Sequence, residues 1–223
     1  MGPIGIIILL LSLGVSQVMR SKFARYAQTR LSADLTGAEI AAQMLREHGI
    51  EDVQITCTDG YLSDHYNPLT KTVNLSAPVF YKKNAAAAAV AAHECGHAVQ
   101  HARSYALLQF RSALVPVVSA SARFMPWVIL LGILVVEKTS LPLELGIGLF
   151  GMTTLFTLVT LPVEFDASRR ALAWMSRQGV VTSQEYSMAK DALWWAAMTY
   201  VIAALGSLAQ LIHLISILNR RRD

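Results

Sequence analysis

The chain has 223 residues, of which 54% are hydrophobic and only 15% are charged, whereas roughly 25% of the residues in an ordinary soluble domain are charged. High hydrophobicity with little charge excludes intrinsic disorder and argues against a soluble enzyme. The net charge of +4 comes without a dense basic patch interleaved with aromatic residues, so the composition predicts a membrane protein and no nucleic-acid partner.

The first apolar run covers residues 3–19 and contains no charged residue. At about 1.5 Å per residue, a helix of this length nearly spans a hydrocarbon core of about 30 Å. A signal peptide would have a basic residue before the run, but here the basic residues follow it. Since cytosolic flanks are rich in Lys and Arg, this pattern predicts an anchor that places residue 21 onward in the cytosol. These basic residues are Arg20, Lys22, Arg25 and Arg30.

Residues 21–112 have the composition of a soluble segment. A capping box of Thr36 and Glu39 predicts a helix that ends near Gly49. Short strands are expected at 53–56 and 72–75, with a turn at Asn67-Pro68 between them. Asn84 is expected to cap an alanine-rich helix that runs through His101, because alanine is the best helix former.

Two further apolar runs, at 114–136 and 143–163, predict a transmembrane hairpin. A polar amphipathic stretch follows at 164–191, and a last apolar run at 193–218 ends in three arginines. A fourth crossing would leave these arginines outside the cytosol, against the positive-inside rule. Either the last run does not cross simply, or 114–136 is not a span, or the rule fails here; the sequence leaves these alternatives open.

The predicted fold is mostly α: an integral membrane helical protein with a small β-hairpin or short sheet. The expected segments are a transmembrane anchor at 1–20, a cytosolic segment at 21–112, the transmembrane hairpin at 113–163, a helix at 164–191, and a C-terminal apolar membrane segment at 192–223.

The sequence His93-Glu94-Cys95-Gly96-His97 is an HExxH motif within the alanine-rich helix. Two histidines four residues apart lie on adjacent turns of one helix face, about 6 Å apart along the axis. Their imidazoles can therefore converge on one zinc ion. Glu94 adjoins the first histidine and is the candidate general base, which takes a proton from the attacking water and hands it to the leaving amine.

A catalytic zinc needs a third protein ligand. His101 lies eight residues beyond His93, about 12 Å along a straight helix, and is too far away to share the ion. The HExxHxxGxxH class is excluded because positions 100 and 103 are glutamine and arginine. The candidates are Glu164, which lies where the hairpin returns to its starting face of the membrane, and Asp166, which could instead orient a histidine.

The chain resembles the bacterial membrane-bound neutral zinc metallopeptidases (YugP-like), over nearly its whole length, and more distantly the HtpX heat-shock protease and the CAAX prenyl endopeptidases. The resemblance implies that Glu164 is the third ligand. The related enzymes usually have an aspartate four residues after this glutamate, where this chain has Ser168, and Asp166 is the candidate replacement. The segments that carry the resemblance are DHYNP at 64–68, HECGHAVQH at 93–101 and PVEFDAS at 162–168.

Other residues are candidates for contacts with a substrate. Tyr66 and His65 could steady an oxyanion, and residues 72–75 could form an edge strand that pairs with an extended peptide. The chain has two cysteines, Cys57 and Cys95, without a metal-binding or disulfide spacing, and both are expected to be reduced and buried.

The sequence therefore predicts a zinc metalloendopeptidase with one zinc ion per chain, in a bacterial cell membrane with its active site facing the cytosol. Its HExxH zinc-peptidase core lies in the segment 21–112, and the helix at 164–191 carries the third zinc ligand. Its expected partners are the lipid bilayer and protein or peptide substrates near the membrane. Two other classes stay open: a zinc-containing membrane scaffold or chaperone without catalysis, against which Glu94 counts, and a metal transporter, which would place its ligands within the spans.

Overall fold

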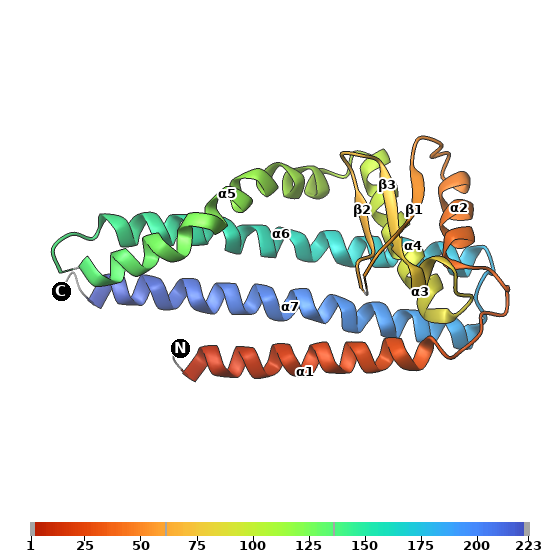
Figure 1. Ribbon diagram of the computed structural model, residues 1–223, viewed down its shortest axis with the longest axis horizontal. Coiled ribbons are helices and arrows are strands. Elements are labelled where there is room, and N and C mark those ends of the chain that lie inside the picture. The colour runs from red at the N-terminus through yellow and green to blue at the C-terminus, as the bar shows by residue number, and fades with distance from the viewer. Residues whose placement is uncertain (1–2, 61, 136, 221–223) are drawn as a thin grey trace. The chain divides into compact units, whose positions relative to one another are not determined.

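The computed structural model describes residues 3–60, 62–135 and 137–220, which form seven helices and one small sheet (Figure 1). The fold is mostly α, as predicted. The elements in chain order are α1 Pro3–Tyr26, α2 Gly37–Glu47, β1 Gln54–Thr58, β2 His65–Asn67, β3 Thr72–Ser76, α3 Ala77–Phe80, α4 Ala85–Ala102, α5 Ala106–Val135, α6 Leu141–Arg177 and α7 Ser183–Arg220.

Four of the described helices are long and apolar enough to cross a membrane: α1, α5, α6 and α7. Their apolar side chains are largely exposed, which suits a lipid environment, since lipid tails are as apolar as the side chains themselves. The apolar windows of these helices are at most 22% buried. The excess of hydrophobic residues in the composition thus lies on these helices.

The chain divides into two compact units. One contains the metal-motif helix and comprises Gly14–Tyr105 and Val163–Met198; the other comprises Met1–Leu13, Ala106–Pro162 and Thr199–Asp223. In the second unit α5 packs closely on α6, because Gly132 has no side chain where the backbone of Leu143 passes. A hydrogen bond of 2.9 Å between Thr157 Oγ1 and Ser207 Oγ joins α6 to α7.

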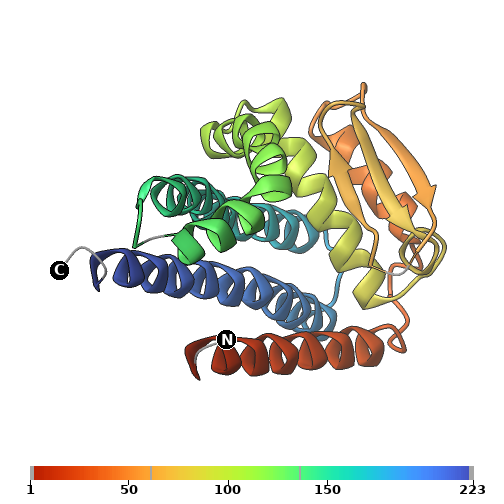
Figure 2. The same cartoon turned by 60° about the vertical axis from the view of Figure 1, so that its left-hand side comes forward.

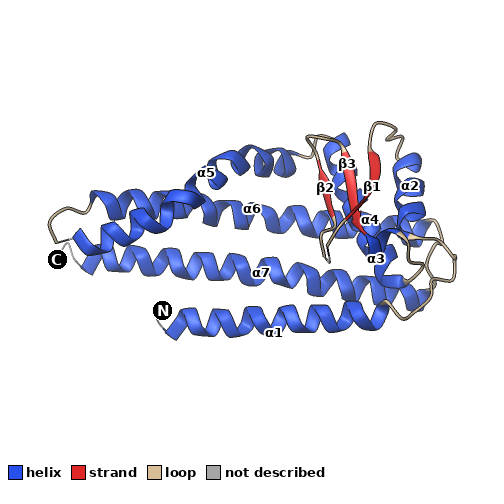
Figure 3. Ribbon diagram, viewed as in Figure 1, coloured by secondary structure: helices blue, strands red, loops and turns tan. Residues whose placement is uncertain are grey.

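The sheet has the strand order β1-β3-β2, with β1 parallel and β2 antiparallel to β3 (Figure 3). The prediction that residues 72–75 form an edge strand is wrong, because β3 is the central strand and Val73 and Leu75 are fully buried. The physical reason is that β3 turns these two side chains into the core while both of its edges are paired. The strands at the two edges are β1 and β2, and β2 contains Tyr66.

Helix α2 begins at the predicted capping box. The Thr36 hydroxyl accepts a hydrogen bond from the backbone N–H of Glu39, and the Glu39 carboxylate accepts one from the backbone N–H of Thr36. The buried face of α2 includes Ile40 and Met44, which are completely inaccessible to solvent. It packs on α4 and forms one core with the sheet and the last turns of α6.

Helix α4 is buried along most of its length. Asn84 caps it by accepting a hydrogen bond of 2.8 Å from the backbone N–H of Ala87. Its alanine run has small side chains, which let neighbouring elements approach closely. Figure 2 shows the ribbon of the helix beside the strands of the sheet. Gly96, within the HExxH motif, has no side chain where the backbone of Ala167 on α6 passes, and a Cβ atom here would lie 2.5 Å from the Ala167 carbonyl oxygen.

We expect Gly96→Ala to separate α4 from α6, because the added methyl group meets a backbone atom that cannot rotate away. Overpacking of this kind costs about 1–3 kcal/mol, and the thermal unfolding temperature of the purified protein in detergent should fall. The matched control is Gly148→Ala on α6, where the added Cβ meets nothing within 4 Å. Equal stability of the two variants would contradict the close approach.

Candidate metal centre

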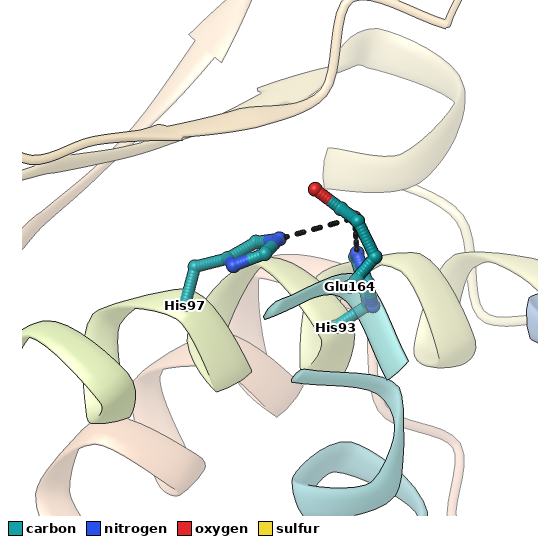
Figure 4. A group of neighbouring side chains, drawn as sticks. All are labelled: His93, His97 and Glu164. Carbon is teal, nitrogen blue, oxygen red and sulfur yellow. Dashed lines mark ion pairs between the residues drawn. The ribbon is translucent and has the colours of Figure 1, made fainter. Parts of the chain in front are cut away.

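Three side chains from two helices converge in the unit that contains α4. His93 and His97 extend from adjacent turns of α4, and Glu164 reaches them from α6 (Figure 4). The Glu164 Oε2 atom lies 3.3 Å from His93 Nε2 and 3.5 Å from His97 Nε2. The ligand atoms of all three residues lie within 4.8 Å of one another.

The two separations between Glu164 and the histidines fit a tetrahedral zinc ion. Two ligand atoms that are each about 2.05 Å from one zinc ion lie about 3.3 Å apart at the tetrahedral angle. The donor set also fits, since imidazole nitrogen and carboxylate oxygen are common zinc ligands in catalytic sites. Among the described residues, these three are the group of His, Cys, Asp and Glu side chains that could hold a metal ion. Asp166 and His213 are not part of this group.

The electrostatics of the cluster favour a cation at its centre. The Glu164 side chain is 4% exposed and the His97 side chain 9%. Burial opposes protonation of His97, but the hydrogen bond and the charge of Glu164 outweigh it and raise the pKa of this histidine. The carboxylate of Glu164 thus stabilises a positive charge on the neighbouring His97.

The tautomer of His97 follows from a chain of buried hydrogen bonds. The Gln100 amide group donates to the backbone carbonyl of Val163 at 2.8 Å and to Asp166 Oδ2 at 2.9 Å. Both partners can only accept, so the amide oxygen of Gln100 faces His97 Nδ1, 3.0 Å away. In the neutral imidazole Nδ1 must then carry the hydrogen, which leaves the Nε2 lone pair for a metal.

His93 is oriented by a different residue. Ser168 Oγ lies 3.1 Å from His93 Nδ1, while Nε2 of this ring faces Glu164. Ser168 therefore contacts a histidine at the position where the related enzymes have an aspartate. Asp166 reaches His97 through Gln100. Asp166 is itself held by ion pairs with Arg169 and Arg170.

Glu94 is fixed by the sheet. Its Oε2 atom accepts a hydrogen bond of 3.0 Å from the backbone N–H of Tyr66 on β2. The edge strand thus lies next to the candidate general base.

Tyr66 and His65 point to other partners. The Tyr66 hydroxyl lies 2.7 Å from His101 Nδ1, and burial, followed by the charge of Asp52, raises the pKa of Tyr66 to about 12. Tyr66 is therefore a neutral phenol at physiological pH. His65 Nδ1 lies 2.8 Å from the carbonyl oxygen of Ser63 on the exposed surface, outside the candidate metal group.

Cys95 faces away from the cluster, and its Sγ atom lies 3.7 Å from the carbonyl oxygen of Ala41. Burial raises the pKa of this thiol, so it stays protonated and belongs to the core. Both cysteines are free, as predicted. The expectation that both are buried is wrong for Cys57, which is exposed because β1 is an edge strand without a buried residue.

Comparison with known proteins identifies the family. The sequence profile of the family described as "Putative neutral zinc metallopeptidase" matches residues 2–219. The chain belongs to this family of neutral zinc metallopeptidases. It is also 39% identical over 205 residues to "Putative membrane protease YugP" of Bacillus subtilis (strain 168), which covers 92% of this chain and 90% of the relative. No solved structure matches the chain.

Membership in the neutral zinc metallopeptidase family implies zinc and supports a protease function. Together with the four long apolar helices and the membrane protease relative, it makes the chain a membrane protein. Sequence reasoning missed Gln100 and the contact of Ser168 with His93. Gln100 could have been found in the sequence, because it is a polar residue three positions after His97 on a helix of mostly small and apolar residues. Residues three apart on a helix are neighbours on its surface, so a contact with His97 could be expected.

We expect the variants Glu164→Ala and Asp166→Ala to differ in metal binding. Glu164→Ala removes one of three candidate ligands, so the purified protein should lose its zinc. Asp166→Ala leaves the ligands in place but removes a support of Gln100, and outer partners of this kind change metal affinity about 10–100-fold. Zinc content and a chelator titration measure both effects. Zinc loss only in Asp166→Ala would show that Asp166, not Glu164, is the ligand.

Proposed function

We propose that the chain is a membrane-embedded zinc endopeptidase that binds one zinc ion through His93, His97 and Glu164 and uses Glu94 as its general base. The observation that carries this proposal is the convergence of these three side chains at separations that suit one ion. Glu94 lies beside these three candidate ligands but is not one of them, and its carboxylate accepts a hydrogen bond from the backbone of β2. A structural zinc site has no need of such a group.

Zinc bound at this position would polarise the scissile carbonyl group and lower the pKa of water at the site. The other steps of the reaction are assigned to side chains of the protein. Glu94 accepts the proton of the attacking water at its carboxylate and passes it to the nitrogen of the departing amine. Gln100 and Ser168 keep the Nδ1 hydrogens of the two histidines in place, so that each ring presents its Nε2 lone pair.

The substrates that suit this site are proteins or peptides close to the bilayer. The candidate metal centre is on α4 and on α6, and α6 is itself one of the four candidate spans. A peptide bond must therefore come to the membrane surface to be cleaved. The basic residues that follow the apolar part of α1 favour a cytosolic location of the centre, in the cell membrane of a bacterium.

Replacement of Glu94 by glutamine tests the mechanism. Glu94→Gln keeps the size of the side chain but removes the proton acceptor, and loss of a general base typically costs about 10²–10⁴-fold in rate. Cleavage of casein by the purified protein should fall by this factor while zinc content stays at the wild-type level. Full activity of Glu94→Gln would rule out the proposed role of Glu94.

Cys57 offers a test of the orientation. It is exposed on the sheet, while Cys95 is buried, so a membrane-impermeant maleimide should react with one thiol per folded chain. We expect labelling in inverted membrane vesicles and none in intact cells, with Cys57→Ala as the control that abolishes the signal. Labelling of intact cells would place the sheet on the outer face of the membrane.

A further inference from the structure

A cavity lies between α6 and α7, in the unit that contains the candidate metal centre. It has a volume of about 280 Å³. Most of its lining is apolar and comes from side chains that include Phe165, Leu172, Leu193 and Trp194. The catalytic proposal uses none of these four side chains.

The charged groups that line this cavity are both basic. They are Arg169 on α6 and Lys190 on α7, and no acidic residue lines the cavity. Asp191, the acid next to Lys190, is already paired with Lys22 at 2.9 Å. Asp166 forms ion pairs with Arg169 and with Arg170. Its single negative charge therefore does not also balance the charge of Lys190. The cavity therefore combines an apolar surface with a net positive charge.

The position of the cavity along the helices suits the surface of a bilayer. Helix α6 has no Lys, Arg, Asp or Glu between Glu144 and Glu164, and α7 has none between Asp191 and Arg220. The cavity lies where these uncharged stretches meet the charged ends. Phe165 and Trp194 face one another there, with ring centroids 6.2 Å apart, and Trp194 is 54% exposed. Tryptophan at such a boundary is typical of the membrane–water interface.

We propose that this cavity binds an anionic phospholipid, with its phosphate at Arg169 and Lys190 and an acyl chain along Phe165 and Trp194. The apolar lining selects a lipid over a free anion, and the two cations select an anionic over a zwitterionic headgroup. Ser168 lines the cavity and also contacts His93, so the lipid lies beside the candidate metal centre. The proposal rests on the cavity and is independent of zinc or catalysis.

Fluorescence quenching by brominated lipids tests this site directly. The full-length protein in neutral detergent is titrated with phosphatidylglycerol or phosphatidylcholine whose acyl chains carry bromine, which quenches tryptophan on contact. We expect phosphatidylglycerol to reach half-quenching at about a fivefold lower concentration. This corresponds to roughly the effect of one basic residue at an anionic surface, because the charge of Arg169 is already balanced by Asp166 and the preference comes from Lys190. Trp194→Phe should remove this difference, because Trp194 is the reporter in the cavity.

Lys190→Gln should abolish the preference for phosphatidylglycerol, while the matched control Lys82→Gln, an exposed lysine outside the cavity, should retain it. Both lysines are on the surface, so neither variant should disturb folding. Equal half-quenching by the two lipids, or an unchanged preference in Lys190→Gln, would overturn the proposal. Displacement of the lipid by excess glycerol phosphate would also overturn it, because the cavity would then be a site for free anions.

Discussion

The candidate metal centre depends on the close approach of α6 to α4 at Gly96. The two histidines need only α4, because their spacing places them on one helix face. Glu164 comes from 67 residues beyond His97 and can reach them only if the backbone of α6 passes against α4. Gly96 allows this, since a side chain there would meet the Ala167 carbonyl. A hydrogen bond of 2.9 Å from the buried Trp174 of α6 to Glu47 of α2 holds the following turns in place.

The same approach makes the hydrogen-bond network around the histidines possible. Gln100 is completely buried and joins His97 on α4 to Val163 and Asp166 on α6. A buried amide group without partners would be costly, so Gln100 both stabilises the contact between the helices and orients the ring. The groups that hold α6 against α4 thus also set the direction of the Nε2 lone pair of His97 toward the candidate metal centre.

Local signals were sufficient to predict much of this protein. The caps at Thr36 and Asn84, the alanine run and the uncharged stretches predicted helices that the structure contains, and the HExxH spacing predicted the pair of histidines. Glu164 was expected from the return of the hairpin and from the resemblance. The central position of β3 and the roles of Gln100 and Ser168 were not predicted, because they depend on pairing and helix contacts between distant parts of the sequence.

X-ray absorption at the zinc edge of the purified full-length protein tests the central claim most directly. If His93, His97 and Glu164 hold the ion, the protein contains one zinc per chain with only nitrogen and oxygen neighbours, at about 2.0–2.2 Å. Sulfur neighbours at about 2.3 Å would mean that a cysteine binds the metal. That result, or protein that retains no zinc when purified from zinc-supplemented cells, would contradict the proposed centre.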